Sequence, residues 1–192
     1  MGLKRYTGSA DNTITNAFAQ PLSTTRATGS NMGASDIMQI FSIFGRNPKK
    51  SATTLGSQEL SRALIKFPVA KISSDRSAGS VPASGSVNFY LRMFNAQHTE
   101  PVPESYTLSV HAISRSWQEG SGLDVITYKD KTQGFTGSNW MSASGKVAWT
   151  DYGGDYLTAS TQWDYSGSDG AARTKPPMYR QDFSTGIEDL EI

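Results

Sequence analysis

The sequence predicts an all-β fold, an antiparallel, jelly-roll-like β-sandwich with long loops rich in Gly and Trp. Several short segments alternate apolar and polar residues with the period of two that half-buried strands show. Clusters of Gly, Pro and Ser separate these segments, and no long segment carries the period of an amphipathic helix. The chain is 36% hydrophobic, which is enough apolar material for a core without disulfides.

The first two expected strands differ in clarity. Ile37–Phe44 fits both the helical and the strand period, and its Ile and Phe content and flanking Gly residues favour a strand. Arg62–Val69 is clearer, because Ala63, Ile65, Phe67 and Val69 form an apolar face, and Pro68 marks the end of the strand or an edge. Residues 47–57 are expected to form a surface loop.

Two further strands follow the turn at residues 81–85. Ser86–Phe94 places Val87, Phe89, Leu91 and Met93 on one side, and Tyr106–Ile113 places Leu108 and Val110 on its apolar side. Trp117 lies just beyond the second strand and is expected to close one end of the sandwich. The predicted core is therefore Ile65, Phe67, Phe89, Leu91, Leu108, Val110 and Trp117.

The N-terminal part has a different composition. Residues 1–33 have few large apolar side chains and turn signals at 10–12 and 29–31, so we expect an N-terminal extension or first strand that makes assembly contacts. Residues 34–192 are expected to form one sandwich domain, since no low-complexity linker or repeat divides them.

Composition and charge exclude several classes of protein. Lys plus Arg is 18 and Asp plus Glu is 17, a balance that argues against a nucleic-acid partner. With no Cys there is no disulfide, thiolate metal site or Cys nucleophile. The N-terminus lacks the apolar stretch of a signal peptide, and Ile37–Phe44 is too short to span a bilayer. We therefore expect synthesis in a cytoplasm, without classical export or membrane insertion.

The loops between Ser114 and Gly170 contain all four Trp residues and many Gly, Asp and Tyr. Long aromatic loops on a β scaffold are common binding surfaces, but Trp rings also plug the ends of such scaffolds. Both interpretations stay open for the candidate ligand or interface aromatics, which are Trp140, Trp149, Tyr152, Tyr156 and Trp163.

Residues with reactive or metal-binding chemistry are few. His98 and His111 lack the spacing of zinc ligands, and no Gly-x-Ser-x-Gly elbow is present. Asp124, Asp151 and Asp155 are candidate calcium ligands, with turn formation as the ordinary explanation for such Asp residues. Glu119 could pair with Asp151 or Asp155 as in a glycoside hydrolase, but we expect it to accept hydrogen bonds from amides of the following loop. We expect no cofactor and no catalysis.

Five segments resemble a known family. They are Ala10–Ile14, Ser61–Phe67, Val87–Met93, the Ser109–Gly120 segment with its Trp-x-Glu-Gly, and Trp149 with Gly153–Tyr156. Together they resemble the DNRLRE-type domain, a β-sandwich similar to carbohydrate-binding modules, and Trp117–Gly120 is the most specific part. With Gly29–Asp36 included, the chain looks most like virion structural proteins of marine tailed phages.

The resemblance implies a structural virion protein that is located in the particle, contacts other virion proteins and forms homo-oligomers. The alternative is an adhesin module whose exposed Trp and Tyr rings stack on host-surface glycans, with a glycoside hydrolase as a more distant third. A further strand should follow Ile187–Ile192 in this family. We expect the sequence to be part of a longer protein, or else the strand to come from a partner.

Overall fold

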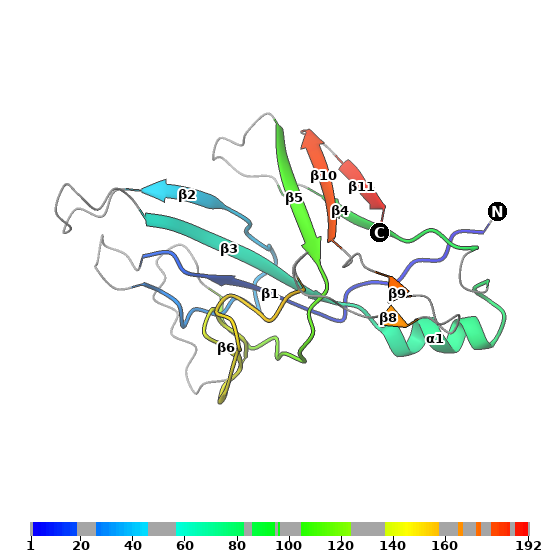
Figure 1. Cartoon of the computed structure of the whole chain (residues 1–192), viewed down its shortest axis with the longest axis horizontal. Coiled ribbons are helices and arrows are strands. Elements are labelled where there is room, and N and C mark those ends of the chain that lie inside the picture. Colours follow the sequence, from blue (N-terminus) through cyan, green and yellow to red (C-terminus); the bar gives the residue numbers. More distant parts are fainter. Residues whose placement is uncertain are drawn as a thin grey trace. The chain divides into compact units, whose positions relative to one another are not determined.

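The computed structural model describes most of the N-terminal two thirds of the chain and several strands beyond it (Figure 1). The described residues are 2–18, 26–45, 57–82, 86–94, 96, 105–123, 137–157, 165–166, 172–173, 178–184 and 187–191. They form antiparallel strand pairs and one short helix, so the fold is mainly β. This agrees with the predicted all-β class.

The chain divides into two compact units, and each is built from two separate stretches of sequence. Unit 1 comprises Met1–Val69 and Arg115–Asp155, and unit 2 comprises Ala70–Ser114 and Tyr156–Ile192. This division differs from the boundary expected at residue 33, because the N-terminal residues belong to the same unit as the loops after Arg115.

Unit 1 is built on a three-stranded antiparallel sheet in the order β1–β3–β2 (Figure 1). Its strands are β1 (Ala10–Thr15), β2 (Ser42–Gly45) and the central β3 (Ser57–Lys66). The turn expected at residues 10–12 is therefore wrong. Ile14, Asn12, Thr13 and Thr15 are almost completely buried, so β1 supplies much of the core. The predicted strand at Ile37–Phe44 is confirmed only from Ser42.

The predicted inner face of β3 needs correction. Leu64 is buried, whereas Ile65 and Phe67 are only half-buried. Arg62, on the same face as Leu64, lies with its guanidinium 4.8 Å from the centre of the Trp140 ring. The segment that carries Trp140 therefore covers the face that the sequence pattern assigned to solvent.

Unit 1 also contains a short hairpin that joins β6 (Ser142–Ser144) to β7 (Val147–Ala148), with a shift of register between Ser142 and Ser144. Asn139 fixes its start, because its side-chain oxygen accepts the amides of Met141 at 2.8 Å and of Ser142 at 2.9 Å.

Helix α1 (Val69–Ser77) replaces the end of the strand that we expected to reach Val69. Pro68, which precedes it, cannot donate to a sheet ladder but fits before a first helical turn. Lys71 lies 3.1 Å from the Asp75 carboxylate one turn later. The strand therefore ends at Lys66, as the Pro68 signal partly indicated, and Val69 is exposed.

The described residues of unit 2 form two strand pairs with long registers and a very short one. In the first, β5 (Ser105–His111) pairs with β10 (Met178–Ser184), and in the second, β4 (Tyr90–Phe94) pairs with β11 (Ile187–Glu191). The short pair is β8 (Tyr165–Ser166) with β9 (Ala172–Arg173). The backbone of 187–191 is thus a strand of this unit.

The expected core positions in unit 2 are partly buried. Leu108 and Val110 are half-buried while the intervening Ser109 is exposed, as the alternation predicts. Leu91 is also half-buried. Phe89 is not a core residue, because β4 begins only at Tyr90 and the Phe89 side chain is 38% exposed. Within the described residues, no helix has the length and apolar character needed to cross a membrane.

Candidate functional site

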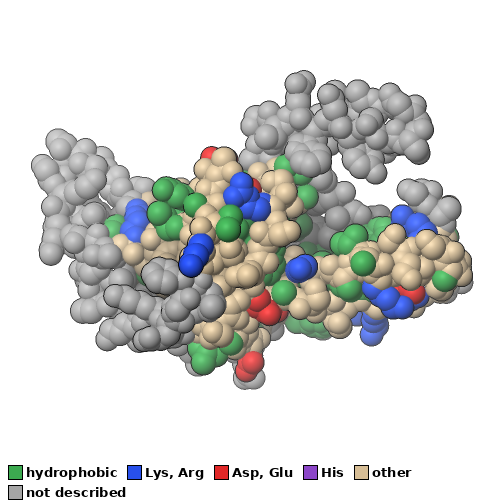
Figure 2. All heavy atoms as spheres, turned by 90° about the horizontal axis from the view of Figure 1, so that it is seen from below, with side chains coloured by type: hydrophobic (Ala, Val, Ile, Leu, Met, Phe, Trp, Pro, Cys, Tyr) green, Lys and Arg blue, Asp and Glu red, His purple; other side chains and the backbone are tan. Residues whose placement is uncertain are grey.

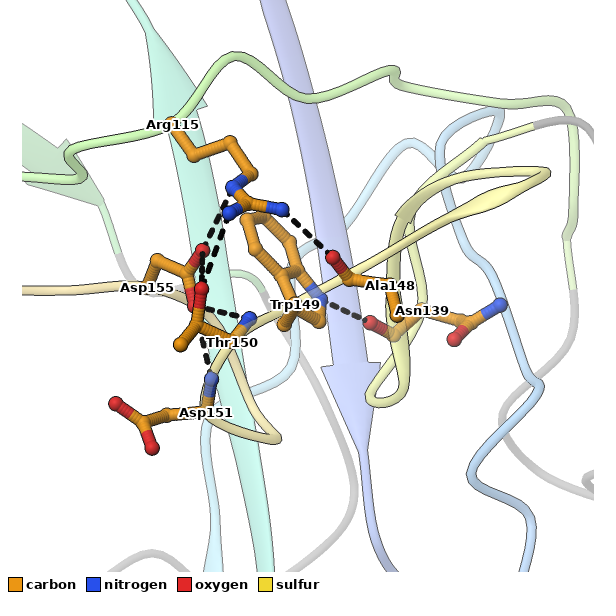
Figure 3. Close-up of polar contacts among 7 residues, drawn as sticks. All are labelled: Arg115, Asn139, Ala148, Trp149, Thr150, Asp151 and Asp155. Carbon is orange, nitrogen blue, oxygen red and sulfur yellow. Dashed lines mark hydrogen bonds and ion pairs between the residues drawn. The ribbon is translucent and has the colours of Figure 1, made fainter.

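Arg115 and Asp155 form an ion pair in the part of unit 1 that holds the candidate residues (Figure 3). The Arg115 Nε lies 2.7 Å from the Asp155 Oδ2. The same guanidinium donates to the Ala148 carbonyl at 2.7 Å and to the Thr150 hydroxyl at 3.0 Å. Arg115 therefore ties the segment after β5 to the segment after β7.

The other oxygen of Asp155 closes a turn. Its Oδ1 accepts the backbone N–H of Thr150 at 2.7 Å and that of Asp151 at 2.9 Å (Figure 3). Both carboxylate oxygens of this buried side chain thus have donors, as turn-forming Asp residues do. The Asp151 carboxylate, by contrast, is exposed and points away from the cluster (Figure 3).

The turn is also anchored at Gly153. Its N–H donates to the Trp140 carbonyl at 2.7 Å, and its carbonyl accepts from the Arg62 Nη1 at 2.6 Å. Gly153 has φ +89°, and a Cβ there would lie 2.5 Å from the Arg62 Nη1, so only glycine fits without strain. Tyr152 lies between these anchored residues, and its side chain is 62% exposed.

Trp140 and Trp149 are structural residues of unit 1. Their exposed fractions are 7% and 3%, so neither ring is available to stack on a ligand. The Trp149 Nε1 donates to the Asn139 carbonyl at 2.8 Å (Figure 3). Of the two interpretations left open by the sequence, packing is therefore the correct one for these two rings.

The remaining predicted aromatic and acidic residues are placed as follows. Trp117 is half-buried, six residues beyond the end of β5. Tyr156 is half-buried in unit 2, where its ring meets His111 edge to face with the ring centres 5.1 Å apart. His111 Nδ1 lies 2.8 Å from the Leu157 carbonyl. Asp124 and Trp163 lie outside the described residues.

Glu119 accepts a backbone hydrogen bond, but its partner is not the loop that we expected. Its Oε1 accepts the N–H of Asp11 in β1 at 2.8 Å. The reason is that the segment around Glu119 runs next to β1 and the Asn31 loop, where the Glu119 carbonyl also accepts from the Asn31 Nδ2 at 2.6 Å. The carboxylate thus fixes the position of a strand.

Two buried asparagines connect four segments of unit 1. The Asn31 Nδ2 donates to the carbonyls of Glu119 and Ser138, and its Oδ1 accepts the amides of Gly33 and Gly122. The Asn12 Nδ2 donates to the Ser138 carbonyl and hydroxyl, and its Oδ1 accepts the Met32 amide at 2.7 Å. Both side chains donate both of their N–H groups, and each amide oxygen accepts at least one backbone N–H, as expected of buried amides.

Gly120 allows this packing. Its φ is +86°, and a Cβ there would overlap the Asn31 side-chain amide. In the Trp-x-Glu-Gly segment, the Glu side chain therefore holds β1 in place, and the Gly leaves room for the Asn31 side chain.

The carboxyl group of Asp11 has a shifted pKa. Partial burial raises the pKa of Asp11 above its usual value, and the negative charge of Glu119 raises it further. Deprotonation of Asp11 thus works against the packing of β1 beside Glu119.

No pattern in the sequence singles out Arg115, Asn12 and Asn31, which hold the unit together. Asn12 and Asn31 lie in predicted turns, where Asn is common on the surface, and Arg115 lacks any distinctive spacing. Their roles depend on partners as far as 126 residues away in sequence.

Among the described residues, no three His, Cys, Asp or Glu side chains gather as metal ligands would. Comparison with known protein families, with curated proteins and with solved structures found no match to this chain.

Proposed function

We propose that the chain is a non-enzymatic structural protein of a tailed-phage virion, a component of the tail, neck, fibre or head decoration. It acts through protein–protein contacts, with other virion proteins and with further copies of itself, in particles assembled in the host cytoplasm. The five segments that resemble the DNRLRE-type domain support this proposal. A jelly-roll-like sandwich is the architecture that we propose for its sheets.

One observation carries the assembly role: large hydrophobic side chains lie in water on a backbone that is firmly held. Hydrophobic side chains reach the surface at several places (Figure 2), and Ile37, Ile40 and Ile43 are each close to half exposed. The residues between them are anchored, since Gln39 N–H donates to the Thr13 hydroxyl at 3.1 Å and Phe41 N–H to the Ser61 hydroxyl at 2.7 Å. Fixed apolar side chains on a surface are typical of protein contacts.

The hydrogen bonds of the Glu119 and Asp155 carboxylates also support a non-enzymatic role. Glu119 and Asp155, which would be the acids of a glycoside hydrolase, each accept backbone amides and so fix the chain. Their hydrogen bonds give a rigid scaffold, as a particle subunit requires.

The experiment is quantitative mass spectrometry of particles purified from the virus that encodes the chain. We expect the protein in a fixed copy number per particle that survives salt washing and density-gradient purification. Presence in infected cells combined with absence from purified particles would contradict the proposal.

A second function, recognition of a host glycan, is favoured by Tyr152. Its exposed ring lies on a turn fixed by Asp155 and Gly153, so little conformational entropy would be lost on stacking. Binding to immobilised host surface polysaccharide should then fall with Tyr152→Ala and stay unchanged with Tyr90→Ala, another exposed Tyr. Equal binding by the Tyr152→Ala protein would exclude this function for Tyr152.

A further inference from the structure

On the outer edge of β2, backbone groups point away from β3, and no described strand pairs with them. The Ser61 N–H donates to the Phe41 carbonyl at 3.0 Å and the Phe41 N–H donates to the Ser61 hydroxyl at 2.7 Å, so the backbone groups of these two residues face each other beside the register Ser42↔Leu60. Such pairs alternate along an antiparallel ladder, so the N–H and C=O groups of Ser42 and Phe44 point away from β3. Within the described residues β2 is the last strand of its sheet.

The direction of the Leu60 backbone groups supports the outward direction of the Ser42 and Phe44 groups. Its carbonyl accepts the Asn16 N–H at 3.1 Å, and its own N–H donates to the Asn16 side chain at 2.7 Å. Leu60 therefore directs its backbone groups to the β1 side, which leaves its partner Ser42 facing outward from the sheet.

The segment that forms this edge lacks two kinds of residue that normally prevent strands from pairing, charged residues and Pro. The segment Ile37–Gly45 reads Ile-Met-Gln-Ile-Phe-Ser-Ile-Phe-Gly, with neither a charged residue nor a Pro. Soluble proteins usually protect an edge with Lys, Pro or a bulge, because an uncharged edge associates with other strands. Here the three exposed Ile side chains add apolar surface that association would bury.

We infer that β2 pairs antiparallel with β2 of a second copy of this chain, about a two-fold axis, and that Ile37, Ile40 and Ile43 lie in the resulting interface. This inference rests on the proposed structural function, in which many copies meet in one particle.

A second copy fits this edge for two reasons. An antiparallel strand pair about a two-fold axis is self-complementary. The outward N–H and C=O groups of Ser42 and Phe44 in one copy therefore face the same set of groups in the other copy. The absence of charge in 37–45 and the net charge of +1 leave little repulsion between identical copies. This segment could not select a strand of another protein by its charge, because the segment contains no charged residue.

The test is the molar mass of the purified full chain, measured by light scattering during size-exclusion chromatography. We expect the wild type at twice the chain mass of 20.8 kDa. Ile43→Lys places a charge on the edge, and Ser42→Pro removes an amide that points outward without removing a bond to β3. Both variants should elute as single chains with unchanged circular dichroism.

The matched control is Val147→Lys, which adds the same charge at an exposed Val of β7 and should leave the mass doubled. A wild type of single-chain mass, or folded edge variants of doubled mass, would overturn the inference. If an edge variant unfolds, hydrogen exchange of the wild type tests the β2 pairing instead. The Ser42 and Phe44 amides should exchange faster on dilution, and rates independent of concentration would overturn the inference.

The proposed function fails separately from this inference. A monomeric wild type that is still present in purified particles removes the β2 pairing and leaves the virion role in place. A dimeric wild type that is absent from purified particles removes the virion role and leaves the β2 pairing in place.

Discussion

Asn31 shows how much of unit 1 depends on one side chain. Its amide holds two carbonyls and two backbone N–H groups from three different loops. Asn31→Ala would remove this partner from the Glu119 carbonyl and from the Gly33 and Gly122 amides, while the Ser138 carbonyl keeps the Asn12 amide, so we expect a loss of about 3–5 kcal/mol in the free energy of unfolding, measured by urea denaturation. Asn88→Ala, at an exposed position, should change it by less than about 0.5 kcal/mol. Similar losses for both variants would contradict the role of Asn31.

Asp11 makes stability depend on pH in a defined direction. Because burial and then Glu119 raise the pKa of Asp11 in the folded state, the folded chain holds this proton more tightly than the unfolded chain. The Asp11 carboxyl therefore lowers the free energy of unfolding as pH rises from its pKa in the unfolded chain through its pKa in the folded chain. This loss of stability persists at neutral pH.

Replacing Asp11 by Asn should remove this cost. We expect Asp11→Asn to be more stable than the wild type at pH 7 and to lose that advantage as pH falls below 3.8, the ordinary pKa of an Asp carboxyl. Thermal melts across this pH range measure the difference, with Asp36→Asn, at an exposed carboxylate, as the control. A pH-independent difference would show that the charge of Asp11 is not responsible.

At the scale of elements, the loop that carries Trp140 and Trp149 supplies core to the sheet. Trp149→Ala should therefore cost about 3–5 kcal/mol of unfolding free energy through the cavity it leaves. Phe89→Ala should cost far less, since Phe89 precedes β4 and is substantially exposed. Chemical denaturation of both variants compares them, and a larger loss for Phe89→Ala would contradict the described packing.

The turn from Trp149 to Asp155 depends on the Asp155 carboxylate. Asp155→Ala should cost about 2 kcal/mol, because the hydrogen bonds involved are charge-assisted. Hydrogen exchange of the Thr150 and Asp151 amides should become faster in this variant. Asp151→Ala, which removes an exposed carboxylate from the same turn, is the matched control and should leave the exchange of the Thr150 amide unchanged.

Sequence patterns predicted best the strand whose burial alternates along the chain. The alternation from Tyr106 placed β5 within two residues at its C-terminal end, because a half-buried strand has a period that the sequence records. Helix α1 was not predicted, since its segment carries only Val69 and Ile72 as large apolar residues and shows no apolar stripe.

The candidate site was less predictable for a physical reason. Trp140 and Trp149 are candidates in the sequence because aromatic residues serve both packing and binding, and composition alone cannot separate the two. What separates them is the set of contacts with Arg62 and Asn139, which depends on the folded chain. The Asn12 and Asn31 bonds are likewise long-range and leave no period in the sequence.

At the scale of the whole molecule, the N-terminal residues have two separate roles. Residues 10–15 form a buried strand, and Asn12 and Thr13 bind neighbouring segments, so this part belongs to the core of unit 1. Residues 2–5 are exposed, and Leu3 is 79% exposed. If the N-terminal residues make assembly contacts, we therefore expect these contacts from the part that precedes β1.

Two deletions distinguish these roles. Removing residues 2–8 keeps β1 and the bond from the Ser9 N–H to the Lys66 carbonyl at 2.7 Å, so the melting temperature should change by only about 2 °C. Removing residues 2–20 takes away β1 and the Asn12 bonds, and unit 1 should lose its cooperative transition in circular dichroism. If Leu3 and its neighbours contact other subunits, the shorter deletion should also lower the copy number in purified particles, because apolar surface is lost from the interface. A folded protein without residues 2–8 that is incorporated at the wild-type copy number would exclude this segment from assembly and leave the exposed isoleucines around β2 as the surface to test.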